Sequence, residues 1–172
     1  MYLVNIETLR NCYMNIKDFK GSENIDIIID NIKKLYKDAT SNKMEMIYID
    51  DEIIYSIINL YDEPSNKINY VNNKLKRKSY ILMPNTIANG MVCNITTSSK
   101  SPIIKKGFLR LNQNSSILNH EHTENVEFYK LINGTLAINK QYMDLNICNI
   151  GESHSIDPVN QPTLVEYVKL DK

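Results

Sequence analysis

The chain contains only three histidines, and all of them lie in a short stretch near its end: His120, His122 and His154. His120 and His122 are two residues apart, so on an extended backbone both imidazoles project from the same face. Glu127 is an odd number of residues from both histidines, so on one continuous strand its side chain would project from the other face. Its carboxylate joins them only if the chain turns or bulges through residues 123–125. Three neutral imidazoles and one carboxylate suit Fe, Mn, Zn, Ni or Co and leave positions free for water or substrate. We therefore expect these four side chains to bind a divalent metal ion.

The residues around this cluster have the pattern of short β-strands. From about residue 79 the spacing of apolar side chains changes from a helical period toward two, and turn-rich pieces such as Pro84-Asn85 separate the stretches. Many short strands with frequent turn signals are typical of a sandwich or a barrel. Asn133-Gly134 predicts a hairpin, because a type I′ turn needs positive φ at both central residues. The predicted strands are 79–83, 89–96, 104–111, 126–132, 135–140, 144–149 and 162–169.

The first half of the chain has mainly helical spacing. Apolar residues predict helices over 6–19 and 23–39 and a third helix that begins after Asp50 and Asp51 and ends at Pro64. Residues 44–49 alternate and predict a strand, either separate from this third helix or running on into 52–58. The expected fold class is α+β: a mainly helical N-terminal subdomain over residues 1–75, followed by a β-barrel domain over residues 76–172.

The residues of the predicted metal site resemble a known family. Residues 119–127 read Asn-His-Glu-His-Thr-Glu-Asn-Val-Glu, and Gly134 follows after six more. This resembles the first motif of the cupin superfamily: His-x-His, three or four residues, Glu, six residues, Gly. Residues 151–154, Gly-Glu-Ser-His, are similar to the core of the second motif, although Asn149 stands where the family usually has Pro and Pro158 where it often has Asn.

The resemblance covers roughly residues 103–172. It implies a cupin-type jelly-roll barrel, a double-stranded β-helix, with a metal ion inside it. The implied ligands are His120, His122, Glu127 and His154.

Two other residues, Tyr129 and Arg110, have two interpretations each. Tyr129 shares the strand face of Glu127 and is a candidate catalytic residue that hydrogen-bonds a ligand or substrate; its alternative role is a core aromatic. Arg110 is either a contact for an anionic substrate or a solvated edge residue. Cys148 is expected to be a small buried hydrophobe, and the basic run at Lys74, Lys76, Arg77 and Lys78 to be a solvated junction.

Composition excludes several classes of partner. Twenty basic and twenty acidic side chains cancel, which disfavours a nucleic-acid partner. The sequence lacks a secretory signal and an apolar run of the roughly 20 residues that a membrane span needs, so no membrane partner is expected. The cysteines at 12, 93 and 148 form no close pair, which favours reduced thiols and a cytoplasmic location.

Two functions are open at this point. The first is a small metalloenzyme, either a metal-dependent dioxygenase or an isomerase or epimerase of sugars or keto acids, that acts on a small polar metabolite. The alternative is a non-catalytic module that binds a small ligand or serves in regulation. In both cases the expected partner is a small molecule, and the family resemblance implies a homodimer.

Overall fold

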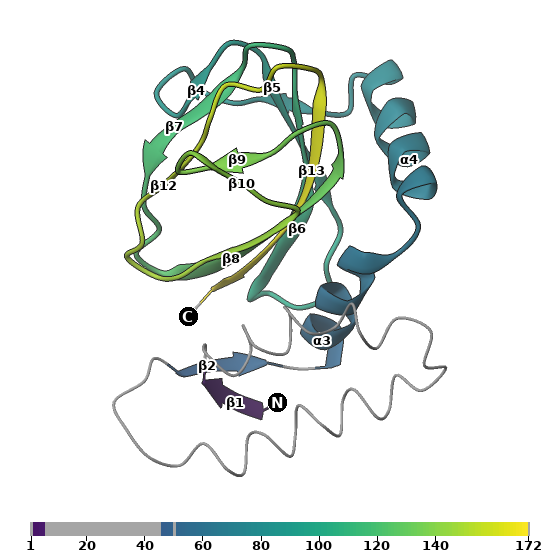
Figure 1. The fold of residues 1–172 in the computed structure, drawn as a ribbon. Helices are drawn as coiled ribbons and strands as arrows, with labels where there is room; N and C mark the ends of the chain where they lie inside the picture. Colours follow the sequence, from purple (N-terminus) through teal and green to yellow (C-terminus); the bar gives the residue numbers. More distant parts are fainter. Residues whose placement is uncertain (1, 6–45, 50, 172) are drawn as a thin grey trace. The chain divides into compact units, whose positions relative to one another are not determined.

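The computed structural model describes residues 2–5, 46–49 and 51–171, and the chain divides into two compact units (Figure 1). One unit is Met1–Asp62 together with Lys172, and the other is Glu63–Asp171. The sequence-based division after residue 75 stays a prediction about domains. Within the part of the chain that is described, no helix is both long enough and apolar enough to cross a membrane.

The first unit combines strands with a helix. Strand β1 (Tyr2–Asn5) pairs antiparallel with β2 (Met46–Ile49), and helix α3 (Asp51–Ile58) continues into the 3-10 helix η1 (Asn59–Tyr61). The separate strand predicted over 44–49 is confirmed for its described residues, 46–49, and the helix predicted after Asp51 is also confirmed. The alternative of a strand running on into 52–58 is wrong. The predicted helices 6–19 and 23–39 lie outside the described residues. Because β1 pairs with β2, the described part of this half is not purely helical.

Helix α4 (Pro64–Lys76) belongs to the second unit and was not predicted. Pro64 ends helical patterns in many sequences, but it also fits the first helical turn, where its missing N–H would have no partner. Lys74 and Lys76 lie in the last turn, where positive charge is favourable. The buried Val71 packs with Ile95 and Phe108, which anchors α4 to the outside of the barrel (Figure 1).

The second unit is a barrel made of two antiparallel sheets. One sheet has the order β10-β9-β12-β7-β4 and the other has the order β11-β8-β13-β6-β5-β3. This arrangement confirms the predicted β-rich second half and is consistent with a cupin-type barrel. The bounds of the strands are β3 Ile81–Leu82, β4 Ala88–Asn89, β5 Val92–Thr97, β6 Ile104–Leu111, β7 Ser116–His120, β8 Asn125–Asn133, β9 Ala137–Ile138, β10 Gln141–Tyr142, β11 Leu145–Cys148, β12 His154–Ile156 and β13 Thr163–Asp171.

The long strands were the predictable ones. β6, β8 and β13 lie in the middle of the six-stranded sheet, and their length and their aliphatic and aromatic residues give a strong signal. The prediction missed β7, β10 and β12, and its single strand over 89–96 did not separate β4 from β5. These strands are short, and β7 and β12 carry polar site residues, His120 and His154, where an apolar residue would have marked a strand.

The hairpin predicted at Asn133-Gly134 is wrong. β8 pairs with β11 and β13, whereas β9 pairs with β10 and β12, so Gly134 carries the chain from one sheet to the other. A side chain at Gly134 would meet Thr163 at the start of β13, and its φ is +97°. The real two-residue turn joins β9 to β10 at Asn139 and Lys140, with φ values of +50° and +66°.

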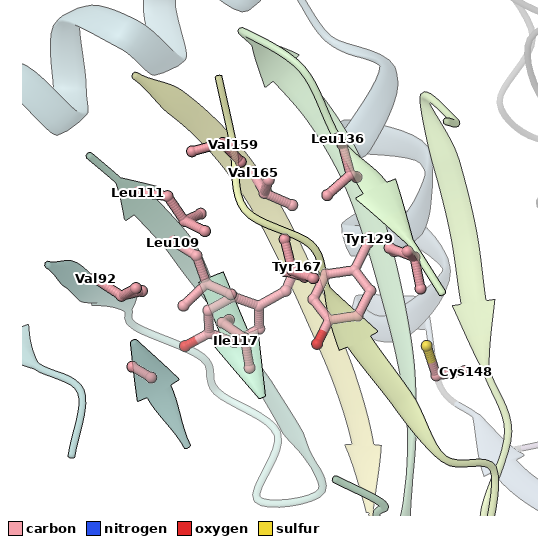
Figure 2. Packing of buried hydrophobic residues seen from close by; sticks show 13 residues of the cluster. Val92, Leu109, Leu111, Ile117, Tyr129, Leu136, Cys148, Val159, Val165 and Tyr167 are labelled. Atoms are coloured by element: carbon pink, nitrogen blue, oxygen red, sulfur yellow. The ribbon is translucent and has the colours of Figure 1, made fainter. Parts of the chain in front are cut away.

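A hydrophobic core fills the space between the two sheets. Figure 2 shows this cluster, in which the rings of Tyr129 and Tyr167 lie among aliphatic side chains. Both phenol oxygens point to the same end of the cluster (Figure 2). Cys148 is buried in the cluster, as the sequence predicted. The core therefore holds two polar groups at one end of the barrel, and that end contains the site.

Candidate metal centre

The four predicted ligands come from both sheets and from the connection between them. His120 is the last residue of β7 and lies directly opposite His154, the first residue of β12. Glu127 belongs to β8 in the facing sheet, and His122 lies in the connection between β7 and β8. The spacing of Glu127 from the two histidines predicted a turn between them. This turn is the connection between β7 and β8, because β8 begins only at Asn125. The four side chains therefore converge inside the barrel.

The cluster is close to the size of a site for one ion. One ligand-type atom from each of His120, His122, Glu127 and His154 lies within 4.8 Å of all the others. A metal ion binds imidazole nitrogen and carboxylate oxygen at about 2.0–2.2 Å, so ligand atoms on opposite sides of an ion lie about 4 Å apart. Glu127 and His154 are each 1% exposed, which shields the inner side of the cluster from water.

The second motif forms the turn that brings His154 into the cluster. Gly151 has a φ of +72°, and its N–H donates to the carbonyl of His122 at 2.8 Å. The Glu152 side chain accepts a hydrogen bond from the backbone N–H of Asn149 at 2.9 Å. The turn therefore forms without the proline that the family usually has at position 149.

Backbone carbonyls orient two of the imidazoles. His120 Nδ1 lies 2.8 Å from the carbonyl of Leu118, and His154 Nδ1 lies 3.2 Å from the carbonyl of Glu152. A carbonyl oxygen only accepts, so Nδ1 carries the hydrogen in both rings and Nε2 is the remaining coordinating atom. Metal-binding histidines are commonly held in this way.

The ligand-type atoms of the cluster face one another at short distances. His154 Nε2 lies 3.2 Å from Glu127 Oε2, and His122 Nε2 lies 3.0 Å from the same oxygen. Two lone pairs at such distances repel unless a proton or a metal ion lies between them. His122 Nε2 is also buried without a hydrogen-bond partner among the described residues. These residues therefore fit a bound divalent metal ion.

Glu127 is ionised and held from both sides. Lys169 Nζ lies 2.5 Å from Oε1, and the Tyr129 hydroxyl donates to Oε2. Burial alone would raise the pKa of Glu127, but the His122 and His154 imidazoles and the charge of Lys169 outweigh it and hold this pKa well below its ordinary value. Burial lowers the pKa of His120, which keeps that ring neutral. Glu127 and His120 thus have the protonation states that metal binding requires.

Tyr129 points inward from β8, two residues after Glu127. Burial and the adjacent Glu127 carboxylate raise the pKa of Tyr129 well above its ordinary value. The phenol therefore stays protonated at neutral pH and acts as a hydrogen-bond donor to Glu127. This geometry favours a positioning role for Tyr129 over the role of a proton acceptor.

A cavity of about 300 Å³ lies beside the cluster. His120, His122 and Glu127 form one part of its wall, and Tyr129 and the exposed Glu121 also line it. The rest of the wall is contributed by residues that sequence reasoning did not select, among them Asn94, Tyr167 and Lys169. A small molecule in this cavity would therefore lie against the cluster.

The positions of these additional residues follow from strand alternation. Tyr167 and Lys169 alternate along β13, in the strand predicted over 162–169, and their register partners on β8 are Tyr129 and Glu127. Glu127 faces inward, and its register partner Lys169 faces the same way. The alternation of side chains along β13 was therefore the signal that could have identified Lys169 as a residue near the site. Arg110 lies outside the cavity lining, and its guanidinium donates to the carbonyl of Leu111.

The ionised state of Glu127 predicts a pH dependence of stability. Its pKa is depressed in the folded state relative to about 4.3 in the unfolded chain. Ionised Glu127 therefore stabilises the fold above the unfolded pKa, and this contribution is lost as the pH falls through the folded pKa. In urea titrations of metal-free protein between about pH 5.5 and about pH 3.5, Glu127→Gln should lose less stability than the wild type. An equal loss of stability in the two proteins over this pH range would contradict this prediction.

The sequence matches no protein-family model and no curated protein. Solved structures match part of it: an acetylacetone dioxygenase from Acinetobacter johnsonii (16% identity, 54% of this chain and 68% of that chain, TM-score 0.46) and KdgF from a Halomonas species (8%, 56% and 91%, TM-score 0.46). The cupin domain of Cnp3 from Schizosaccharomyces pombe matches at 12% identity over 47% of this chain and 61% of that chain, with a TM-score of 0.41.

The resemblance to the cupin superfamily depends on the architecture and the motif residues themselves. Two antiparallel sheets close around a core, and the His-x-His, Glu and His residues of the two motifs meet inside them. The Gly residues of both motifs, Gly134 and Gly151, have the positive φ that their turns require. The fold and the residues of both motifs therefore resemble the cupin superfamily.

Proposed function

We propose that this protein is a small metalloenzyme in which His120, His122, Glu127 and His154 hold a divalent metal ion and a small polar metabolite binds in the adjacent cavity. The observation that carries the proposal is the buried cluster of ligand-type atoms that face one another. Among the described residues His122 Nε2 has no hydrogen-bond partner, and His154 Nε2 faces Glu127 Oε2 at 3.2 Å.

The bound metal would supply Lewis-acid chemistry, or dioxygen chemistry if it is iron. The residues of the chain have separate tasks. The carbonyls of Leu118 and Glu152 fix the tautomers of His120 and His154. Lys169 and Tyr129 hold the Glu127 carboxylate in one orientation. The apolar part of the cavity wall limits the access of water to this end of the barrel.

Metal content and oxygen uptake test the proposal and separate the two reaction classes. Protein purified without chelator should carry about one equivalent of metal per chain. Iron together with oxygen uptake on a candidate substrate indicates a dioxygenase, whereas zinc, manganese, nickel or cobalt without redox activity indicates an isomerase or epimerase. Protein that carries no metal and takes up none from a buffer containing these ions would contradict the proposal and favour the non-catalytic module.

Substitution of His122 tests the metal site well because the next residue in the sequence provides a matched control. His122→Ala should lower metal affinity by more than the roughly 10–100-fold that loss of an outer partner costs. Thr123→Ala, at the next and exposed position, should leave the affinity unchanged. Isothermal titration with zinc measures both. Full metal binding by His122→Ala would show that this imidazole is not a ligand.

Tyr129→Phe tests the positioning role of the phenol. The substitution removes the donor to Glu127 Oε2 but keeps the ring in the core. We expect metal affinity to fall by about 10–100-fold, the usual cost of losing an outer hydrogen-bond partner. The same zinc titration measures the loss, and unchanged thermal unfolding excludes a packing defect. Unchanged affinity would leave Tyr129 with a core role only.

A further inference from the structure

The cavity has a polar wall that the metal site does not use. Asn94 on β5, together with Tyr167 and Lys169 on β13, lines the cavity in addition to the metal-site residues. Four aliphatic side chains form the apolar part of the wall: Met83, Ile87, Leu109 and Ile117. A ligand that fits this cavity therefore combines a short apolar portion with a polar group.

The positive charge of Lys169 indicates which charge the polar group of the ligand carries. Its ammonium group lies 2.5 Å from Glu127 Oε1 and 5.7 Å from the centre of the Tyr167 ring, and the side chain is 26% exposed. Lys169 and Glu127 cancel each other's charge, so a divalent ion bound at the imidazoles leaves the cavity with an excess of positive charge. Apart from the imidazoles, the other charged residue in the described lining is Glu121, which is exposed. The cavity therefore favours an anion.

Asn94 adds an oriented donor to this wall. The Tyr167 hydroxyl donates to Asn94 Oδ1 at 2.9 Å, which fixes the side-chain amide and leaves its NH₂ group as a donor. Tyr167 reaches Asn94 by lying across β6 at Gly107, its register partner. A Cβ at Gly107 would lie 2.9 Å from the Tyr167 hydroxyl. The glycine thus gives Tyr167 the room to hold the amide.

We propose that the cavity recognises a small monocarboxylic acid with a short aliphatic chain. Its carboxylate binds Lys169 and the Asn94 amide, and its chain packs against the aliphatic wall. This inference rests on the proposed metal site and specifies its ligand class. A single ammonium group matches one carboxylate, whereas a phosphate dianion is usually bound by several cations or backbone N–H groups. The cavity volume of about 300 Å³ suits a molecule of this size.

Hexanoate and hexanamide are probes that differ only in the charged group. Isothermal titration of zinc-loaded protein should show hexanoate binding, and hexanamide should bind more weakly by about tenfold or more. Lys169→Met keeps most of the side-chain volume and should weaken hexanoate binding by about tenfold or more. Lys106→Met is the matched control, since Lys106 is a half-buried lysine on β6 outside the cavity lining; it should leave binding unchanged.

Asn94→Ala provides a second variant that leaves the Lys169–Glu127 pair intact and should weaken hexanoate binding several-fold. Equal hexanoate binding by the wild type, Lys169→Met and Asn94→Ala would overturn the inference, and so would equal binding of hexanamide and hexanoate. The absence of hexanoate binding in protein that has loaded zinc would overturn the inference alone. Lys169-dependent hexanoate binding in protein that takes up no metal would overturn the proposed function and the charge argument that depends on the metal, and would uphold only Lys169 as the carboxylate contact.

Discussion

Glu127→Ala should abolish stoichiometric metal binding. Glu127 supplies the one carboxylate of the cluster, is 1% exposed and lies within 3.2 Å of two imidazole nitrogens. Its removal takes away one of the four proposed ligands and the negative charge that would offset the metal and Lys169. The loss of affinity should exceed the roughly 10–100-fold cost of removing an outer partner. Metal analysis after dialysis and zinc titration both measure it.

The same stretch of chain offers a matched control. Glu124 lies three residues before Glu127, is exposed, and lies outside the cluster. Glu124→Ala should retain the metal in full. Glu127→Ala should also lower the free energy of unfolding of the metal-free protein by about 1–3 kcal/mol, because Lys169 loses its partner but still reaches solvent. Equal metal content in the two variants would contradict the assignment of Glu127.

Gly107→Ala should destabilise the barrel strongly. Gly107 lies in the middle of β6, and a Cβ there would lie 2.3 Å from the carbonyl oxygen of Ile95 and 2.9 Å from the Tyr167 hydroxyl. The carbonyl belongs to the neighbouring strand β5, so this clash is relieved only if the backbone of the sheet shifts. We expect a loss of about 3 kcal/mol, the upper end of the usual cost of overpacking. Urea unfolding of the metal-free protein measures it.

Gly151→Ala is the control for this substitution. Gly151 has a φ of +72°, but a Cβ at this position would have no other described atom within 4 Å, so the change strains only the backbone. That strain costs about 1 kcal/mol. A smaller loss of stability for Gly107→Ala than for Gly151→Ala would contradict the tight packing of Tyr167 across β6.

The site was more predictable from the sequence than the strand pairing. Motif spacing selected His120, His122, Glu127 and His154 because a ligand set leaves a fixed pattern of residue types along the chain, and the structure brings all four together. The hairpin at Asn133-Gly134 failed because positive φ is needed at sheet-to-sheet crossings as well as in hairpins. Which strands pair is decided by contacts distant in the sequence.

The additional residues of the cavity wall were also not predicted, because their contacts join residues that are distant in the sequence. Lys169 interacts with Glu127 from another strand that lies far along the chain, so no local pattern reports the contact. Helix α4 was missed for a different reason. Pro64 signals either the end or the beginning of a helix, and the packing of Val71 against Ile95 and Phe108 selects the beginning.

Diffraction from crystals of zinc-loaded protein, measured on both sides of the zinc absorption edge, tests the metal site most directly. We expect one anomalous peak per chain, about 2.0–2.2 Å from Nε2 of His120, His122 and His154 and from a carboxylate oxygen of Glu127. An anomalous peak bound elsewhere, or these four side chains gathered around no peak at all, would contradict the assignment of the metal site.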